Sequence, residues 1–367
     1  MPEHAIEGGP RRAARLTQPV MQRGEPLRTV PTLADVARLA GVSTATVSRC
    51  LNEPSRVVGK TRQRVLDAVA ELGYAPNFGA RALVARQTDT VGAVIPTMEN
   101  AVFARGIQAF QEELGRHGKT LLVASSAYRA ELEEEQVRAL VARGAEALLL
   151  IGHDRDPALY DFLGKRGVPA LVAWSYDPAV PTPSIGFDNR GAMAGLARVI
   201  LAQGHRDLAV ISAPTASNDR ARGRVEGVRD ALRETGLDPS SLEVVETPYG
   251  IENGEAALRQ VMARAPRTTA VLCVNDVLAI GALRAAREMG RSVPGELSIT
   301  GFDDLELATL VEPALTTVHV PHREMGRRAA AMLLRMLSGG AAETVELPTD
   351  IRLRRSLAPP GRGRSEA

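Results

Sequence analysis

From Thr90 onward, short apolar runs alternate with amphipathic stretches. The amphipathic stretches, such as residues 103–118 and 133–144, place apolar side chains at helical spacing. Strands that alternate with helices predict parallel sheets that are covered on both faces. Seven runs are too many for one small sheet, so the pattern predicts two doubly wound lobes with a cleft between them. The runs cover residues 90–96, 120–125, 147–152, 169–174, 207–212, 270–275 and 297–302.

Aromatic and polar side chains gather where these runs end. In doubly wound sheets a ligand sits beyond the carboxyl ends of the strands. Arg220 and Arg224 are four residues apart at the start of a predicted helix, so they share one face. The other side chains at or just after strand ends are Phe103, Trp174, Tyr249, Asn275 and Asp303.

The stretch before the sheets has a helical period instead. Thr32 followed by Asp35 is typical of a capped helix start, and Gly41 ends this first helix. Ser43 begins a second helix, whose outward face carries small side chains and Arg49. Two short helices joined by a tight glycine turn predict a helix-turn-helix, whose second helix enters the major groove of DNA. An arginine there can donate two hydrogen bonds to a guanine edge.

A third helix is predicted from about Thr61 to Leu72, and a short helical piece from Asn77 to about Ala85. This last piece is too short to be stable alone in water, so we expect it to form only when something holds it. Leu83 would then be available as an apolar wedge in a minor groove.

The charge is unevenly distributed, although the formal net charge of the chain is only +2. Residues 1–86 hold 13 Lys and Arg against 7 Asp and Glu, whereas residues 87–367 hold 32 against 36. The positive charge therefore accompanies the helix-turn-helix, as expected for a protein that neutralises phosphates.

Composition and cysteine content limit the compartment. Cys50 and Cys273 are the only cysteines and lie far apart, which favours a reducing compartment. No apolar run approaches the length needed to span a membrane. The pair Arg11-Arg12 is not followed by the apolar region of an export signal, so we expect a cytoplasmic protein. The leader is rich in Arg, Gly and Pro and is expected to be disordered.

The stretch from Thr32 to Arg86 resembles the lactose-repressor (LacI/GalR) family of bacterial regulators. The resemblance rests on the segments TLADVARLAGVSTATVSRCLN, KTRQRVLDAVAELGY and PNFGARAL. Position 50, usually an apolar β-branched residue in that family, is Cys50 here, and a small buried thiol should pack adequately. Position 56 varies in the family, as does Gly59.

The resemblance implies a DNA-binding role for many residues of this region. Thr44, Ala45 and Arg49 are expected to face bases. Asn52, Arg56 and Thr61 are expected to touch phosphates, and Leu83 to intercalate from a hinge helix. Further expected DNA contacts are Thr32, Leu33, Ser43, Thr46, Ser48, Asn77 and Ala80.

The rest of the chain resembles the periplasmic-binding-protein-like core of the same family. Marker segments are DNRGAMAGLARVILAQGHRDLAVIS, NDVLAIGALRAAREMGRSVPGELSITGFDD and PALTTVHVP. The resemblance implies a two-lobed core with an effector pocket between the lobes. Its expected lining is Phe103, Arg224, Tyr249, Asn275 and Asp303, with Trp174 and Arg220 nearby.

The predicted organisation follows from these features. We expect an all-α helix-turn-helix domain, a hinge helix and an α/β two-lobed core for effector binding and dimerisation. Within the core, residues 88–187 with 319–340 would form one lobe, and residues 188–318 with 341–357 the other. The parts are a disordered leader (1–31), the DNA-binding domain (32–76), the hinge (77–87), the core (88–357) and a disordered tail (358–367).

The pocket residues suggest the class of effector. Aromatic faces pack against the C–H surfaces of sugars, while Asp and Asn fix hydroxyl groups by hydrogen bonds. Arg220 and Arg224 could together hold a carboxylate or phosphate. The run Asn218-Asp219-Arg220-Ala221 resembles regulators that respond to gluconate-like sugar acids. We therefore expect a sugar or a sugar acid as effector.

Several other functions find no support in the sequence. Gly59-Lys60-Thr61 imitates a phosphate loop, but Pro54 stands where its first glycine is required. His319, His322 and Glu324 lack the spacing of a metal site, and neither a nucleophile elbow nor a dinucleotide fingerprint is present. We therefore expect no catalytic residues, metal or cofactor, which argues against an α/β enzyme.

The combined prediction is a cytoplasmic transcription regulator, most simply a repressor. Two copies would dimerise through the core and place their helix-turn-helix units on a palindromic, double-stranded operator. The chain ends without leucine heptads, which favours a dimer over a tetramer. The alternative is a sugar-binding receptor without DNA-dependent function. The basic first domain argues against this alternative.

Overall fold

The computed structural model describes residues 30–75, 87–99 and 101–361. The chain divides into two compact units, residues 1–84 and 85–367, which are treated separately below. The first contains only helices, and the second contains two β-sheets with their covering helices. No helix among the described residues is long and apolar enough to cross a membrane.

The first unit is the expected helix-turn-helix. The Thr32 hydroxyl accepts a hydrogen bond from the Asp35 amide, and the Asp35 carboxylate accepts one from the Thr32 amide. Gly41 ends the first helix in the left-handed conformation (φ 61°), where glycine meets no steric penalty. The third helix begins two residues earlier than predicted. The elements are α1 (Leu33–Ala40), α2 (Thr44–Asn52), η1 (Pro54–Arg56) and α3 (Gly59–Leu72).

The core of this unit is small and aliphatic. Val36, Val47 and Val65, one from each helix, are completely buried against one another. Cys50 is also buried in this cluster, as the sequence predicts, and its thiol lies 3.8 Å from the Arg62 carbonyl oxygen. With its apolar side chains turned inward, α2 leaves its polar face to solvent.

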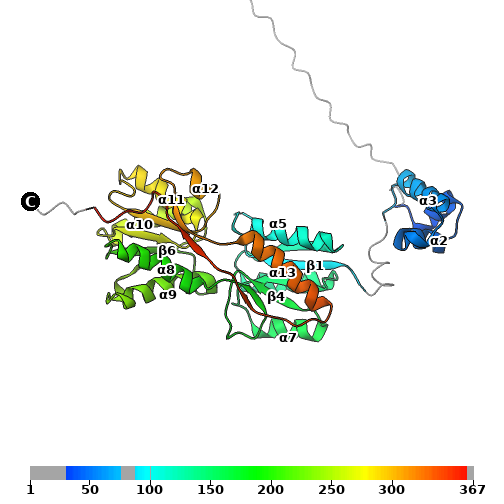
Figure 1. Ribbon diagram of the computed structural model, residues 1–367, viewed down its shortest axis with the longest axis horizontal. Helices are drawn as coiled ribbons and strands as arrows, with labels where there is room; N and C mark the ends of the chain where they lie inside the picture. Colours follow the sequence, from blue (N-terminus) through cyan, green and yellow to red (C-terminus); the bar gives the residue numbers. More distant parts are fainter. Residues whose placement is uncertain (1–29, 76–86, 100, 362–367) are drawn as a thin grey trace, which may run out of the picture. The chain divides into compact units, whose positions relative to one another are not determined.

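The second unit contains two six-stranded sheets, which confirms the two-lobed α/β prediction (Figure 1). Every strand pair in the first sheet is parallel. In spatial order its strands are β11 (Val345–Glu346), β5 (Ser184–Gly186), β4 (Ala170–Ala173), β3 (Ala147–Ile151), β1 (Thr90–Ile95) and β2 (Thr120–Ser125).

The second sheet repeats this plan, except that its edge strand β12 is antiparallel to β10. All its other pairs are parallel. In spatial order its strands are β12 (Asp350–Arg352), β10 (Thr316–His319), β9 (Ser298–Asp303), β8 (Ala270–Cys273), β6 (Leu208–Ser212) and β7 (Glu243–Glu246).

Helices cover both faces of each sheet, as the burial of successive residues in the central strands requires, because these residues point to opposite faces. In the first sheet Val94 and Leu148 pack with one group of helices (α6 and α7), whereas Val91 and Leu149 pack with the other (α5 and α13). The first lobe holds α5 (Ala101–Arg116), α6 (Ala130–Ala142), α7 (Pro157–Arg166) and α13 (His322–Leu337). The second holds α8 (Asn189–Ala202), α9 (Asp219–Glu234), η2 (Pro239–Ser241), α10 (Ile251–Arg264), α11 (Asp276–Glu288) and α12 (Leu307–Leu310).

The chain crosses between the lobes three times, and one crossing differs from the prediction. The first two crossings follow β5 and β10, close to the predicted positions. The predicted assignment of residues 341–357 to the second lobe is wrong at its start, because Val345 and Glu346 pair with β5 of the first sheet. The third crossing therefore comes after Glu346 and not after residue 340.

The predicted disorder of the C-terminal tail is also wrong for its first residues. The Ala358 carbonyl oxygen lies 2.8 Å from His205 Nε2 and accepts a hydrogen bond from the Ser298 hydroxyl at 3.1 Å. Residues 358–361 thus continue along the second lobe, while residues 362–367 lie outside the described part of the chain.

Candidate effector site and nucleic-acid surface

All seven predicted pocket residues meet in one cavity between the lobes of the core. The cavity lies at the carboxyl ends of the strands, where parallel sheets place their ligand sites. Its free volume is only about 20 Å³, so the lobes enclose it tightly. It is lined by Val102, Phe103, Tyr128, Trp174, Arg220, Arg224, Tyr249, Asn275 and Asp303.

Phe103 and Trp174 form the apolar wall on the first lobe. Their ring centroids are 5.4 Å apart with planes at 70°, an edge-to-face contact. Trp174 is 1% exposed, and its indole N–H donates to His322 Nδ1 at 3.1 Å. A methyl group at Gly106 would lie 2.5 Å from the indole, so α5 needs glycine there to approach it. Trp174 is therefore a rigid wall of the cavity.

Arg224 enters from the second lobe as a buried cation. Its Nε donates to Asn189 Oδ1 at 2.9 Å, and its Nη1 donates to the Val274 carbonyl oxygen at 2.5 Å. The guanidinium lies 3.7 Å from the centre of the Phe302 ring, a cation–π contact. Burial lowers the pKa of Arg224, and the nearby carboxylate of Asp303 opposes that shift.

Asp303 ends β9 and points into the cavity without a hydrogen-bond partner. Among the described residues neither of its carboxylate oxygens has one, although the residue is 1% exposed. The closest charge is Arg224 Nη2, 3.8 Å from Oδ1. Burial raises the pKa of Asp303 to about 7, against the opposing effect of the two arginines. A buried carboxylate without donors calls for a ligand that supplies them.

Asn275 and Asp276 hold the strand ends around the cavity. Asn275 Oδ1 accepts the Leu278 amide at 2.9 Å and so caps α11. Asp276 accepts hydrogen bonds from the Thr317 hydroxyl at 2.6 Å and from the Leu305 amide at 2.7 Å. Burial raises the pKa of Asp276 to about 8. Asp276, which the sequence analysis did not single out, thereby fixes the loop that follows Asp303.

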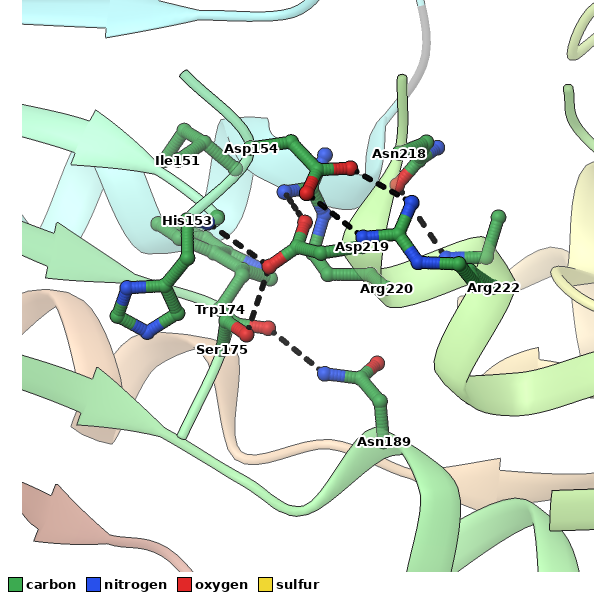
Figure 2. A network of polar contacts seen from close by, with 12 residues as sticks. Ile151, His153, Asp154, Trp174, Ser175, Asn189, Asn218, Asp219, Arg220 and Arg222 are labelled. Carbon is green, nitrogen blue, oxygen red and sulfur yellow. Dashed lines mark hydrogen bonds and ion pairs between the residues drawn. The ribbon is translucent and has the colours of Figure 1, made fainter. Parts of the chain in front are cut away.

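Asp219 joins the second lobe to the first, beside Arg220 (Figure 2). Its Oδ2 accepts hydrogen bonds from the His153 amide at 2.8 Å and the Ser175 hydroxyl at 3.0 Å. Its Oδ1 accepts Arg220 Nη1 at 2.9 Å. Burial raises the pKa of Asp219, but the charge of Arg220 and these hydrogen bonds outweigh it, so the pKa lies below its usual value.

Two further contacts hold the lobes together in the same network (Figure 2). Arg222 on α9 donates to both carboxylate oxygens of Asp154, at 2.6 and 2.9 Å. Asn189 Nδ2 donates to the Trp174 carbonyl oxygen at 3.0 Å, while its Oδ1 receives Arg224. Hydrogen bonds and an ion pair therefore hold the two lobes together around the cavity.

The two predicted arginines both reach the cavity, but each is already engaged by the protein. Arg220 pairs with Asp219, and Arg224 is bound by Asn189 and a backbone carbonyl. A ligand carboxylate that approached Arg220 would meet the negative charge of Asp219. Gly152 permits the closeness of Arg220, because a Cβ there would lie 1.7 Å from its Nη1.

Tyr128 is a cavity residue that the sequence analysis missed. Its ring centroid lies 5.4 Å from that of Tyr249, with the planes tilted by 44°. Burial raises the pKa of both phenols. Tyr128 stands three residues after β2, so the rule that selected the other strand-end residues would also have selected it.

The backbone at these strand ends is strained. Left-handed φ angles in residues other than glycine are uncommon and cluster at functional sites. Within the described chain six such residues occur, and only Asp89 lies away from the strand ends at the cavity. The other five are Ala127, Tyr128, Trp174, Asp303 and Asp304.

In the first unit the predicted base-facing residues lie on one face of α2. Thr44, Ala45 and Arg49 are exposed. The hydroxyls of Ser43 and Thr46 lie 2.9 Å apart, and Ser43 Oγ also accepts the Thr46 amide as the helix cap. These two hydroxyl groups therefore form hydrogen bonds at the N-terminus of α2.

The other predicted DNA contacts are more varied. Thr32 caps α1, and Leu33 is its first, half-buried residue. Ser48 is half-buried on α2, and Thr61 is half-buried in the first turn of α3. Arg56 is exposed and pairs with Glu53 at 2.8 Å. Outside the described part of the chain are the Asn52 side chain and all of Asn77, Ala80 and Leu83.

Among the described residues, no group of three or more His, Cys, Asp or Glu side chains could hold a metal ion. His322 is engaged by Trp174, and His319 Nδ1 lies 2.9 Å from Asp304 Oδ2. Burial lowers the pKa of His322 to about 3, so it is neutral at ordinary pH.

Known proteins match this chain in both of its units. Residues 32–77 match the family of bacterial regulatory proteins called the lacI family, and residues 197–357 match a periplasmic binding protein-like domain. The HTH-type transcriptional repressor PurR of Edwardsiella ictaluri (strain 93-146) is 33% identical over 334 residues, 89% of this chain and 97% of that protein.

Solved structures extend the comparison. The Lac repressor dimer bound to operator and the anti-inducer ONPF is 29% identical with a TM-score of 0.77, over 89% of this chain and 99% of that chain. The complex of the transcriptional regulator CelR with cellobiose is 31% identical with a TM-score of 0.65, again over 89% and 99%.

Proposed function

Because this chain belongs to the lacI family of bacterial regulatory proteins, we propose that it is a homodimeric repressor controlled by a sugar. It binds a palindromic operator through the helix-turn-helix and binds its effector in the cavity of the core. In this proposal residues 32–76 bind DNA and residues 77–87 connect them to the core, as the sequence predicts. As a DNA-binding regulator it acts in the cytoplasm, and its named relatives are regulators and not enzymes.

The exposed face of α2 supports the DNA-binding proposal. Small side chains at Thr44 and Ala45 let the helix lie deep in the major groove, and Arg49 on the same face reaches a guanine edge. Arg56 and Thr61 contact phosphates, and Leu83 enters the minor groove. The similar Lac repressor was solved as a dimer bound to operator, which supports the same assembly here.

Asp303 is the observation on which the effector proposal depends. Its two partnerless oxygens need donors, and a sugar supplies adjacent hydroxyl groups in the right number. Phe103 and Trp174 offer apolar walls to the C–H faces of the same ring. The pairing of Arg220 with Asp219 favours a neutral sugar over a sugar acid. The similar regulator CelR was solved with cellobiose.

The small size of the cavity explains how effector binding would change the arrangement of the lobes, and through it the affinity for DNA. A free volume of about 20 Å³ holds one or two water molecules and no sugar ring. The effector must therefore bind an arrangement with the lobes further apart, which gives it different affinities for the two arrangements. Such a difference is what an effector needs to change the affinity for operator.

Two binding experiments test the proposal. Calorimetry with a panel of neutral sugars, aldonic acids and a purine base should show binding of a neutral sugar. Anisotropy of a labelled operator selected from genomic fragments should then change when that sugar is added. If no sugar binds but the base does, the effector proposal is wrong; if no duplex is preferred at modest salt, the repressor proposal is wrong. The second result would favour a receptor without DNA-dependent function.

A further inference from the structure

A second, much larger space adjoins the cavity around Asp303. This outer cleft has a free volume of about 860 Å³, against about 20 Å³ for the inner cavity. Tyr128 and Tyr249, whose rings are in contact, line both spaces. The two spaces therefore adjoin at the tyrosine pair, which belongs to the lining of each.

The strand order explains why the region has two parts. Near the crossings between the lobes, the ends of β4, β8 and β9 supply the inner residues Trp174, Asn275 and Asp303. At the opposite edge of each sheet, segments after β1 and β2 face segments after β6 and β7 and enclose the outer cleft. A ligand can therefore extend along the sheet edges, from the crossings toward the outside.

The outer cleft differs from the inner cavity in its chemistry. Met98 on the first lobe and Ile251 on the second both line it, and they are 62% and 39% exposed. Pro214 and Pro248 add further apolar surface, and the polar groups lie among them. Large apolar side chains that face a cleft from both lobes are typical of a surface that a ligand covers.

We propose that the outer cleft is a second subsite, which holds a second ring of the effector. The effector is then a disaccharide or other glycoside with one ring at Asp303 and the next between Met98 and Ile251. The tyrosine pair packs at the linkage between the rings. This inference rests on the proposed sugar specificity, and it adds the size of the ligand and the residues that select for it.

Calorimetry on the full-length protein can separate the two subsites. The probes are glucose, galactose, cellobiose, maltose and lactose, with methyl and phenyl glucoside as further pairs. A second ring should tighten binding on the order of tenfold to a hundredfold over the matching monosaccharide. The double variant Met98→Ser/Ile251→Ser should lose most of that gain and keep its affinity for the monosaccharide. Both side chains are substantially exposed, so the substitutions leave the fold intact.

Leu353→Ser is the matched control, because Leu353 is 61% exposed and lies in neither space. Its disaccharide affinity should equal that of the wild type. A disaccharide preference that disappears only in the double variant supports the outer subsite. Equal binding of mono- and disaccharides overturns it and leaves the sugar proposal standing. A tenfold gain from the phenyl group without one from a second sugar ring assigns the cleft to an aromatic group and overturns the disaccharide.

Discussion

The buried carboxylate of Asp303 should make the ligand-free protein less stable as the pH rises. Its pKa is raised from 3.8 to about 7, because burial disfavours the charged form. An acid whose pKa is raised in the folded state does not lower the free energy of unfolding at a pH below its unfolded pKa. Above that pH the free energy of unfolding falls, until the pH has passed the folded-state pKa. The full loss corresponds to about 4 kcal/mol, since one pKa unit is worth about 1.4 kcal/mol.

Asp303→Asn removes this titration while preserving the shape of the side chain. Near pH 4 the variant and the wild type should be equally stable. Between pH 4 and 8 the variant should become progressively more stable, until the difference in unfolding free energy levels off at about 2–4 kcal/mol. The same variant should bind the effector roughly tenfold or more weakly, because it loses a charged acceptor.

Urea unfolding at a series of pH values measures this difference. Trp174 is the only tryptophan in the chain and lies in the cavity, so its fluorescence reports on the core alone. Asp350→Asn, at an exposed aspartate on β12, is the matched control and should follow the wild type. A variant that is no more stable than the wild type at pH 8, or whose advantage does not depend on pH, would refute the reasoning.

Three other substitutions test separate parts of the structure. Arg49→Ala should weaken operator binding roughly tenfold to a hundredfold and relax base preference, with unchanged calorimetry for sugar; unchanged selectivity would contradict it. Arg222→Ala releases Asp154 and weakens the closed arrangement, so calorimetry should show effector binding about two- to fivefold tighter. Gly152→Ala, at φ 74°, should displace Arg220 and lower the free energy of unfolding, measured in urea, by about 1–3 kcal/mol. Wild-type stability would contradict that steric argument.

Much of the candidate site could be predicted because parallel strands all end at the same sheet edge. Phe103, Trp174, Tyr249 and Asp303 come from distant parts of the chain, yet each stands at or just after a strand end or at the start of the helix that follows. Alternation of apolar runs and helices was therefore enough to bring them together. The helix-turn-helix was equally accessible, because capping residues and Gly41 mark its helix ends locally.

The features that could not be predicted depend on contacts between residues far apart in the sequence. A two-residue strand such as Val345–Glu346 has too short a pattern to detect, and it forms only because β5 offers an edge. The engagement of Arg220 by Asp219 and of Arg224 by Asn189 likewise depends on how closely the lobes approach. The arginines alone suggested an acidic ligand, and only the structure shows that Arg220 is already paired with a carboxylate and that Arg224 donates to neutral acceptors.

The closed core brings together stabilising contacts and one destabilising group at the same place. Asp219, Arg222 and Asn189 clasp the lobes, while closure keeps Asp303 buried without donors. Opening would hydrate that carboxylate, and a sugar in the opened cavity would supply its missing hydrogen bonds. Effector binding and rising pH should therefore shift the lobes in the same direction. Since a ligand acts only through its different affinities for two arrangements, the unsatisfied carboxylate would give a sugar the preference for the open arrangement that the proposed regulation needs.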